Sequence, residues 1–192
     1  LENMPAWIEK YGKDAAFFCT NDGHTEPLLR QVAALGGYFV EADLPSPLMG
    51  YPGALGIDLS KEQGDWPAIL RKVEEAVIKA GGGGRMGTWA YSWGYTTTAA
   101  LVEYGKNYVE GTFTKKLGSA QALKEMRAAY DKFCPGAHWG ASYFVDAATG
   151  VKNPHFVLLR QDTYVLGGDY LGLADVEIPE KYFQIRMTPA AN

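Results

Sequence analysis

Hydrophobic and polar positions along the first 111 residues alternate between two periods. Ala15–Thr20, Gly37–Ala42 and Met86–Ala90 are largely apolar runs, which are typical of strands buried on both faces of a sheet. Between them, apolar residues recur at helical spacing over 25–35 and 66–80. Strands and helices that alternate with short links predict an α/β fold, a three-layer sandwich with a mainly parallel sheet and helices on both faces.

Further helices and strands are expected outside these segments. The additional helices are Met4–Tyr11 with Asn3 as its N-cap, Thr96–Val109, and one that Ser119 caps. Leu44–Gly56 is so rich in proline and glycine that we expect an irregular loop there, leading to a short strand at Leu55–Leu59. The last third is expected to hold a hairpin and two more strands, at Trp139–Asp146, His155–Arg160, Tyr164–Leu166 and Tyr182–Arg186.

Polar side chains and aromatic rings stand where the expected strands end. Asn21 and Asp22 follow the first strand just before a helix that Thr25 is expected to cap, and Asp43 ends the second strand. Ligands bind at this carboxyl edge in open α/β sheets, where a carboxylate accepts from hydroxyls and an amide both donates and accepts. The rings that could stack on a ligand are Trp89, Tyr91 and Trp93.

Each of these residues also has a purely structural explanation. Asp22 and Asp43 are favoured residues for helix caps and turns, and Asn21 can satisfy a turn in its own backbone. The aromatic rings could equally pack in the core. The sequence leaves both explanations open.

Composition and charge narrow the classes of partner. The chain has 192 residues, 47% of them hydrophobic and 21% charged, as in globular proteins. Its net charge of −4 and the lack of a basic run argue against a nucleic-acid partner. It has no apolar run of membrane-spanning length and no signal-like start. Because Leu1-Glu2-Asn3 is not a native beginning, we expect a piece of a longer chain.

Reactive groups with a defensible pattern are scarce. Cys19 lies in an expected strand, which favours a buried free thiol, with a disulfide to Cys134 as the alternative. Gly81–Arg85 lacks the phosphate-loop pattern, and no zinc-type spacing or nucleophile elbow is present. We therefore expect no cofactor, no metal and no catalytic residue. An α/β enzyme that uses Asp22 and His24 as acid and base is an alternative.

The chain resembles the second lobe of type I periplasmic solute-binding proteins in its strand, Asn-Asp and helix element, Phe17–Asp22. It also resembles, in Gly84–Ala90 and the helix after it, the strand of these proteins that returns toward the hinge. More narrowly, Trp7–Gly12 and Tyr51–Ile57 are similar to an uncharacterised bacterial lipoprotein-like family within that superfamily. The resemblance covers roughly Met4–Gly111.

The resemblance implies non-catalytic binding of a small polar or ring-containing solute for ABC-type transport. Ligand contacts would come from Asn21, Asp22, Asp43, Trp89, Tyr91 and Trp93. It further implies a membrane permease as partner and an extracytoplasmic location, periplasmic or as a cell-surface lipoprotein. Residues 1–118 would form the ligand-binding lobe, and 119–192 would return to the hinge or the other lobe.

Two departures from the superfamily's pattern matter. The chain has length for little more than one lobe, so we expect a partial chain whose first lobe is supplied by another chain or segment. The Pro45–Gly56 loop is longer than in sugar-binding relatives, so the ligand class is not carried over. The alternative function is a ligand-sensing domain of a regulator or receptor, which would share the fold.

Overall fold

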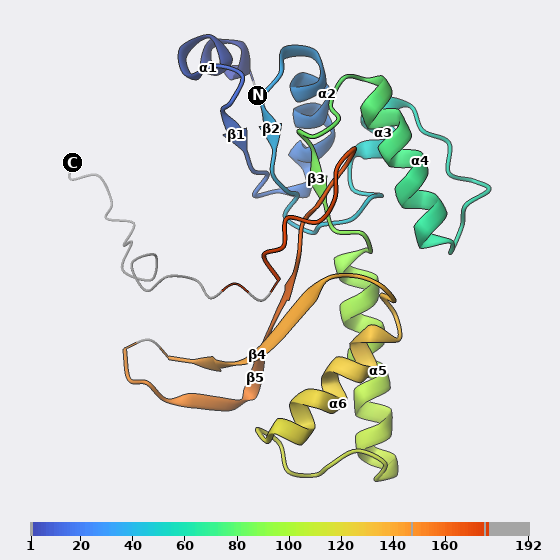
Figure 1. Ribbon diagram of the computed structural model, residues 1–192, viewed down its shortest axis with the longest axis vertical. Coiled ribbons are helices and arrows are strands. Elements are labelled where there is room, and N and C mark those ends of the chain that lie inside the picture. The colour runs from blue at the N-terminus through green and yellow to red at the C-terminus, as the bar shows by residue number, and fades with distance from the viewer. Residues whose placement is uncertain (1, 147, 175, 177–192) are drawn as a thin grey trace.

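The computed structural model of the protein describes residues 2–146, 148–174 and 176 (Figure 1). The helices are α1 (Met4–Tyr11), the short 3₁₀ helix η1 (Asp22–His24), α2 (Thr25–Leu35), α3 (Tyr51–Leu55), α4 (Trp66–Lys79), α5 (Trp93–Glu110) and α6 (Ala120–Asp131). The strands are β1 (Ala16–Phe17), β2 (Tyr38–Phe39), β3 (Gly87–Thr88), β4 (Trp139–Val145), β5 (Lys152–Gln161) and β6 (Tyr164–Val165).

The helices follow the local signals of the sequence. The Asp65 carboxylate accepts the Ala68 N–H at the start of α4, and Ser119 Oγ accepts the Ala122 N–H at the start of α6. The helices expected around 25–35, 66–80, 96–109 and after Ser119 are confirmed. Asn3 occupies the N-cap position of α1, as expected, although its side chain makes no capping hydrogen bond. Thr25 is the buried first residue of α2 and His24 stands at the N-cap position, so the prediction that Thr25 caps α2 is wrong.

The prediction of a mainly parallel three-layer sandwich is wrong. The described strands form three two-stranded sheets, and two of the three are antiparallel. β1 and β2 pair in parallel, but each is only two residues long, and Phe39 adds a single parallel bridge to Met86. The longest pairing is the antiparallel β4–β5 hairpin, from Trp139 opposite Gln161 to Val145 opposite Lys152. The fold is therefore mixed α/β with short sheets.

The segment expected to be an irregular loop contains α3. Tyr51 is 1% exposed and donates its hydroxyl to the Gly87 carbonyl, O to O 2.7 Å, so burial of one ring fixes this turn against β3. Pro52 suits the first turn of α3 and Gly56 ends it in the left-handed region at φ 66°. The strand expected at Leu55–Leu59 does not form, because Leu55 belongs to α3. Tyr182–Arg186 lies outside the described residues.

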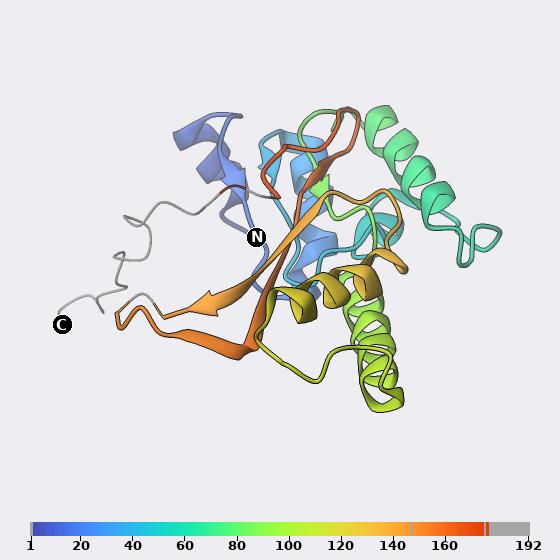
Figure 2. The same ribbon diagram turned by 60° about the horizontal axis from the view of Figure 1, so that its bottom comes forward.

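Two hydrophobic clusters organise the molecule. The first joins α2, α4 and the short strands, with Leu29, Val73, Phe39 and Met86 almost fully buried. The second lies at α5 and α6 and is centred on Tyr130. Figures 1 and 2 show α5 and α6 side by side next to the β4–β5 hairpin, while β1, β2 and β3 lie with α2 at the other end.

Candidate functional site

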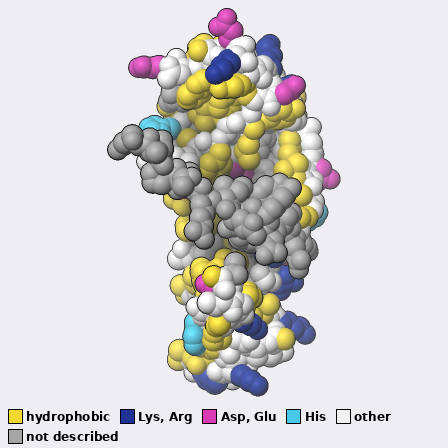
Figure 3. Space-filling view, turned by 90° about the vertical axis from the view of Figure 1, so that its left-hand side faces the viewer, with side chains coloured by type: hydrophobic (Ala, Val, Ile, Leu, Met, Phe, Trp, Pro, Cys, Tyr) yellow, Lys and Arg dark blue, Asp and Glu magenta, His cyan; other side chains and the backbone are white. Residues whose placement is uncertain are grey.

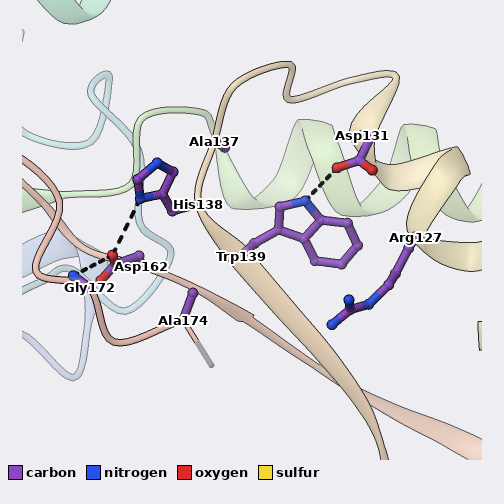
Figure 4. Close-up of a pocket in the computed structure, with 8 residues that line it drawn as sticks. All are labelled: Arg127, Asp131, Ala137, His138, Trp139, Asp162, Gly172 and Ala174. Atoms are coloured by element: carbon purple, nitrogen blue, oxygen red, sulfur yellow. Dashed lines mark hydrogen bonds and ion pairs between the residues drawn. The ribbon is translucent and has the colours of Figure 1, made fainter. Parts of the chain in front are cut away.

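A cavity of about 420 Å³ lies where α6, the start of β4, the residue after β5 and a following loop meet (Figure 4). We name it the Asp162 cavity. Its lining consists of Arg127, Asp131, Ala137, His138, Trp139, Asp162, Gly172 and Ala174. Four of these side chains carry ionisable groups, so the cavity is suited to polar molecules.

Asp162 is the fixed point of the cavity. Its residue is 2% exposed, and its two carboxylate oxygens accept the backbone N–H groups of Gly172 at 2.7 Å and Leu173 at 3.0 Å. Its own backbone N–H donates to the His138 carbonyl at 2.9 Å. A buried carboxylate needs such partners, and here they hold the 172–173 loop beside the start of β4.

His138 provides an open ring beside this carboxylate. Its Nδ1 lies 3.9 Å from Asp162 Oδ2, close enough for an ion pair when the imidazole is protonated. One face of the imidazole stacks on Tyr170, with ring centres 4.0 Å apart and planes 21° apart. The side chain is nevertheless 60% exposed. Burial raises the pKa of Tyr170 to about 12, so this phenol stays protonated at neutral pH.

The opposite wall is built on α6. Trp139 Nε1 donates to Asp131 Oδ1 at 2.7 Å, and the indole packs against the Tyr130 ring with centres 4.5 Å apart. The Arg127 guanidinium lies 5.7 Å from the centre of the same indole and donates to the Ala141 carbonyl. Asp131 and Arg127 are one helical turn apart, which places a carboxylate and a guanidinium on the same wall.

Two of the three polar residues expected to bind a ligand at the strand ends accept hydrogen bonds from the backbone. Asn21 accepts the Gly23 N–H at 2.9 Å, and Asp22 Oδ1 accepts the Leu44 N–H at 3.1 Å. The second bond joins the chain after β1 to the chain after β2, and Asp43 beside it is exposed. Asp22 thus has a structural role, although it is a tie between two chain segments and not the helix cap that was the expected alternative. The ligand contacts of all three residues stay predictions.

The three predicted aromatic residues separate in the structure. Tyr91 is buried, its hydroxyl donates to the Pro135 carbonyl at 2.8 Å, and burial raises its pKa. Trp89 is half-buried, and Trp93 is 39% exposed at the first position of α5. Tyr91 lines a second cavity of about 600 Å³, whose other rings are Trp66, Tyr95 and Phe133. None of the three lines the Asp162 cavity.

The expected thiol chemistry agrees with the structure. Cys19 and Cys134 are buried and unpaired, 3% and 1% exposed, and burial raises the pKa of Cys134 to about 12, which keeps that thiol protonated. His24 is exposed, and Asp22 engages Leu44, so their use as an acid–base pair gains no support from these contacts. Over the part of the chain that the structure describes, no cluster of three metal-ligating side chains occurs.

Sequence reasoning missed every ionisable residue of the Asp162 cavity. Asp162 follows directly on β5, so the strand-end argument applied to Asp22 and Asp43 would have reached it once β5 was extended by one residue. The i, i+4 spacing of Arg127 and Asp131 was also readable. His138 shares the cavity with Asp162 and with the two α6 residues only because the β4–β5 hairpin packs against α6. The sequence pattern does not predict that packing.

Two segments of the chain match known protein families. Residues 1–87 match the family described as "Protein of unknown function (DUF3798)", and residues 98–185 match a second family whose description names no function. No helix among the described residues is long and apolar enough to cross a membrane.

A crystal structure from Clostridium difficile 630, described as a candidate transcriptional regulator, shares the fold. The TM-score is 0.65 at 20% identity, over 85% of this chain and 44% of that one. An uncharacterized protein of Treponema pallidum (strain Nichols) is 36% identical over 72 residues, and this chain spans only 31% of its length. A second uncharacterized protein of the same organism is 33% identical over 88 residues, which make up 46% of this chain and 94% of that protein. The chain therefore belongs to the family of this second Treponema pallidum protein.

Proposed function

We propose that the protein binds a small polar, ring-containing solute in the Asp162 cavity without catalysing its conversion. One observation carries the proposal: a buried carboxylate, an open imidazole, and a carboxylate and guanidinium from α6 converge on one cavity. Its volume of about 420 Å³ lies within the range of small-molecule sites, roughly 300–1,000 Å³.

We assign a different role to each ionisable residue named below. The exposed face of the His138 ring, opposite Tyr170, offers a stacking surface for a ring of the solute. Oδ1 of Asp131 accepts a hydrogen bond from the Trp139 indole, and Oδ2 can accept one from a hydroxyl or amine of the solute. Asp162 is already committed to two backbone N–H groups, so we assign it the positioning of the loop and of His138.

Delivery of the solute to a membrane permease, from an extracytoplasmic location, belongs to the same proposal. Its support is the sequence resemblance of Phe17–Asp22 to solute-binding proteins. A ligand-sensing role is the second candidate, and the fold shared with the Clostridium difficile protein described as a candidate regulator favours it. The two differ in what ligand binding changes: docking to a permease or the state of an attached regulatory partner.

The binding test uses two cavity variants and one control. A thermal-shift screen of polar ring compounds would select a ligand, and calorimetry would then measure its affinity for wild type, Asp131→Asn and His138→Ala. We expect each variant to bind roughly tenfold more weakly, about 1.4 kcal/mol. Glu110→Gln, which changes an exposed carboxylate at the end of α5, should bind as wild type does.

Two results would reject the proposal. Unchanged affinity in both cavity variants would place the ligand elsewhere. Chemical conversion of the selected ligand by the wild-type protein, detected by mass spectrometry, would show that binding is not the whole activity.

A further inference from the structure

The parallel pair β1–β2, which the Phe39–Met86 bridge joins to the residue before β3, has one covered face and one exposed apolar face. Phe39 and Met86 point into the first hydrophobic cluster and are 1% and 0% exposed. On the other face, which we name the outer face, the exposed residues are Phe18 at 54%, Tyr38 at 36%, Val40 at 42% and Leu171 at 53%. Parallel strands are normally covered on both faces, so this pattern marks a surface built for contact.

The outer face is also hollowed. A cavity of about 260 Å³ lies along it, lined by Ala16, Tyr38, Val40, Val165 and Leu171 among others. In the view of Figure 3, which faces the side of α1 and β1, hydrophobic side chains gather around a hollow in the upper part of the molecule. A hollow with apolar walls favours an apolar side chain from a partner over a polar ligand.

The edge of the sheet at β1 is open as well. In the described residues β1 pairs on one side only, with β2. The chain after β1 continues into the exposed Phe18. An unpaired strand edge with apolar side chains is a template for a further strand.

The longer relatives indicate what occupies these surfaces. The chain spans 31% of the first Treponema pallidum protein and 44% of the Clostridium difficile protein, which shares its fold over 85% of this chain. We propose that the outer face and the β1 edge are covered by the part of the longer relatives that this sequence does not span. That part would add a strand beside β1 and lay an amphipathic helix over Val40 and Leu171.

The rim of the outer face adds a charge requirement. The Arg85 guanidinium lies 4.6 Å from the centre of the Tyr38 ring, donates to the Lys13 carbonyl, and stands 3.4 Å from the largely exposed Asp14 carboxylate. Because this ion pair is exposed, it is weak, and a partner carboxylate could replace it. We therefore expect the covering helix to carry an acidic residue beside its apolar stripe.

The test is a binding measurement with a defined polypeptide. The probe is the portion of the longer Treponema pallidum relative outside the 72 matched residues, purified and titrated at micromolar concentrations against this protein. Light scattering should show a one-to-one complex. Val40→Glu and Leu171→Glu should each weaken it about tenfold or more. Val109→Glu, at a position 80% exposed on α5, should leave it unchanged.

Three results would overturn the inference. These are no complex with the wild-type protein, a complex that Val40→Glu leaves intact, and self-association of this chain that Val40→Glu abolishes, which would make a second copy the occupant. Circular dichroism would confirm that the variants fold, as expected for exposed positions. The loop that carries Leu171 also lines the Asp162 cavity at Gly172 and Ala174, whereas Val40 is not among the residues that line that cavity. Solute binding measured in Val40→Glu therefore tests the cavity independently of this result.

Discussion

The region around the first hydrophobic cluster and the region around the second are held together in different ways. The first buries a cluster of fourteen residues, mainly aliphatic, between helices and two-residue strands. The second buries only five, of which two are tyrosines, beside a hairpin whose longer strand is mostly exposed. Apolar burial therefore dominates the first region, whereas hydroxyl contacts carry a larger share in the second.

The difference shows which information the sequence displays. Aliphatic residues at helical spacing identify α2 and α4 without any knowledge of their partners. In the second region, the Tyr130 hydroxyl meets Thr96 and Thr97 of α5 and accepts from Gln161 of β5. Such contacts between elements have no periodic signature.

The largest effect should come from the first cluster. Phe39 is 1% exposed and packs edge to face on Tyr51, with ring centres 6.1 Å apart. Phe39→Ala would leave a cavity between the sheet and α3, and we expect the free energy of unfolding to fall by about 3–5 kcal/mol. Urea titration measures this loss. Leu101→Ala, at an exposed position of α5, should change stability by less than about 0.5 kcal/mol. Equal losses at both positions would contradict the comparison.

The next effect concerns a buried carboxyl that joins the two regions. Glu41 is 8% exposed and Thr163 donates to its Oε2 at 3.2 Å. Its Oε1 is buried and has no hydrogen-bond partner among the residues that the structure describes. Burial raises the pKa of Glu41 from 4.5 to about 8, so the folded protein keeps a proton that the unfolded chain releases. The stability from this group is complete below pH 4.5 and is lost as the pH rises through about 8.

Glu41→Gln should remove that pH dependence. We expect the wild-type free energy of unfolding to fall by roughly 2–4 kcal/mol more than that of the variant between pH 4.5 and 8. Chemical denaturation at several pH values gives both curves. Glu75→Gln, an exposed residue of α4, is the matched control and should follow wild type. Parallel curves for wild type and Glu41→Gln would show that Glu41 ionises normally.

Much of the first region could be predicted from the sequence, but the class of sheet could not. The apolar runs around β1, β2 and β3 predict longer parallel strands, yet only two residues of each run are paired as strand. Periodicity reports burial, and it does not report how many residues find a hydrogen-bonding neighbour. The antiparallel partner of β3 is β6, which lies far along the chain. No local sequence pattern predicts that these two strands pair.

The third effect tests the hydroxyl contacts of the second region. Tyr130→Phe keeps the ring against Trp139 but removes the oxygen that accepts from Gln161 and lies 3.3 Å from Thr97 Oγ1. We expect a loss of about 1–2 kcal/mol, since partners that are partly buried stay unsatisfied. Thermal unfolding of wild type and variant measures it. Tyr108→Phe, on α5, is the control. A similar loss of stability in that variant would contradict the claim that the hydroxyl contacts of Tyr130 stabilise this region.

The candidate site was less predictable than the fold. Asp22, Asp43 and Asp162 all come after strands, and of the three only Asp162 lines the cavity between α6 and the start of β4. What distinguishes it is burial against the loop of Gly172 and Leu173, a contact that forms only after the chain returns from the hairpin. A residue type at a strand end states what chemistry is available, and the tertiary packing decides whether a cavity stands beside it.

The smallest expected effect separates the two explanations for Asp22. Its carboxylate accepts the Leu44 N–H at 3.1 Å, and Leu44 is exposed, so water can replace the bond when the carboxylate is removed. Asp22→Ala should therefore lose only about 0.5–1.5 kcal/mol of stability. Asp22→Asn keeps an oxygen acceptor, and its stability should lie closer to that of wild type.

A binding measurement then tests whether Asp22 acts only in this bond. If it does, calorimetry with the ligand selected for the Asp162 cavity should give equal affinities for wild type and both variants. A large loss of affinity in Asp22→Asn, with stability retained, would instead move the ligand to the carboxyl ends of β1 and β2, because only a direct contact with the charge would distinguish the amide from the carboxylate.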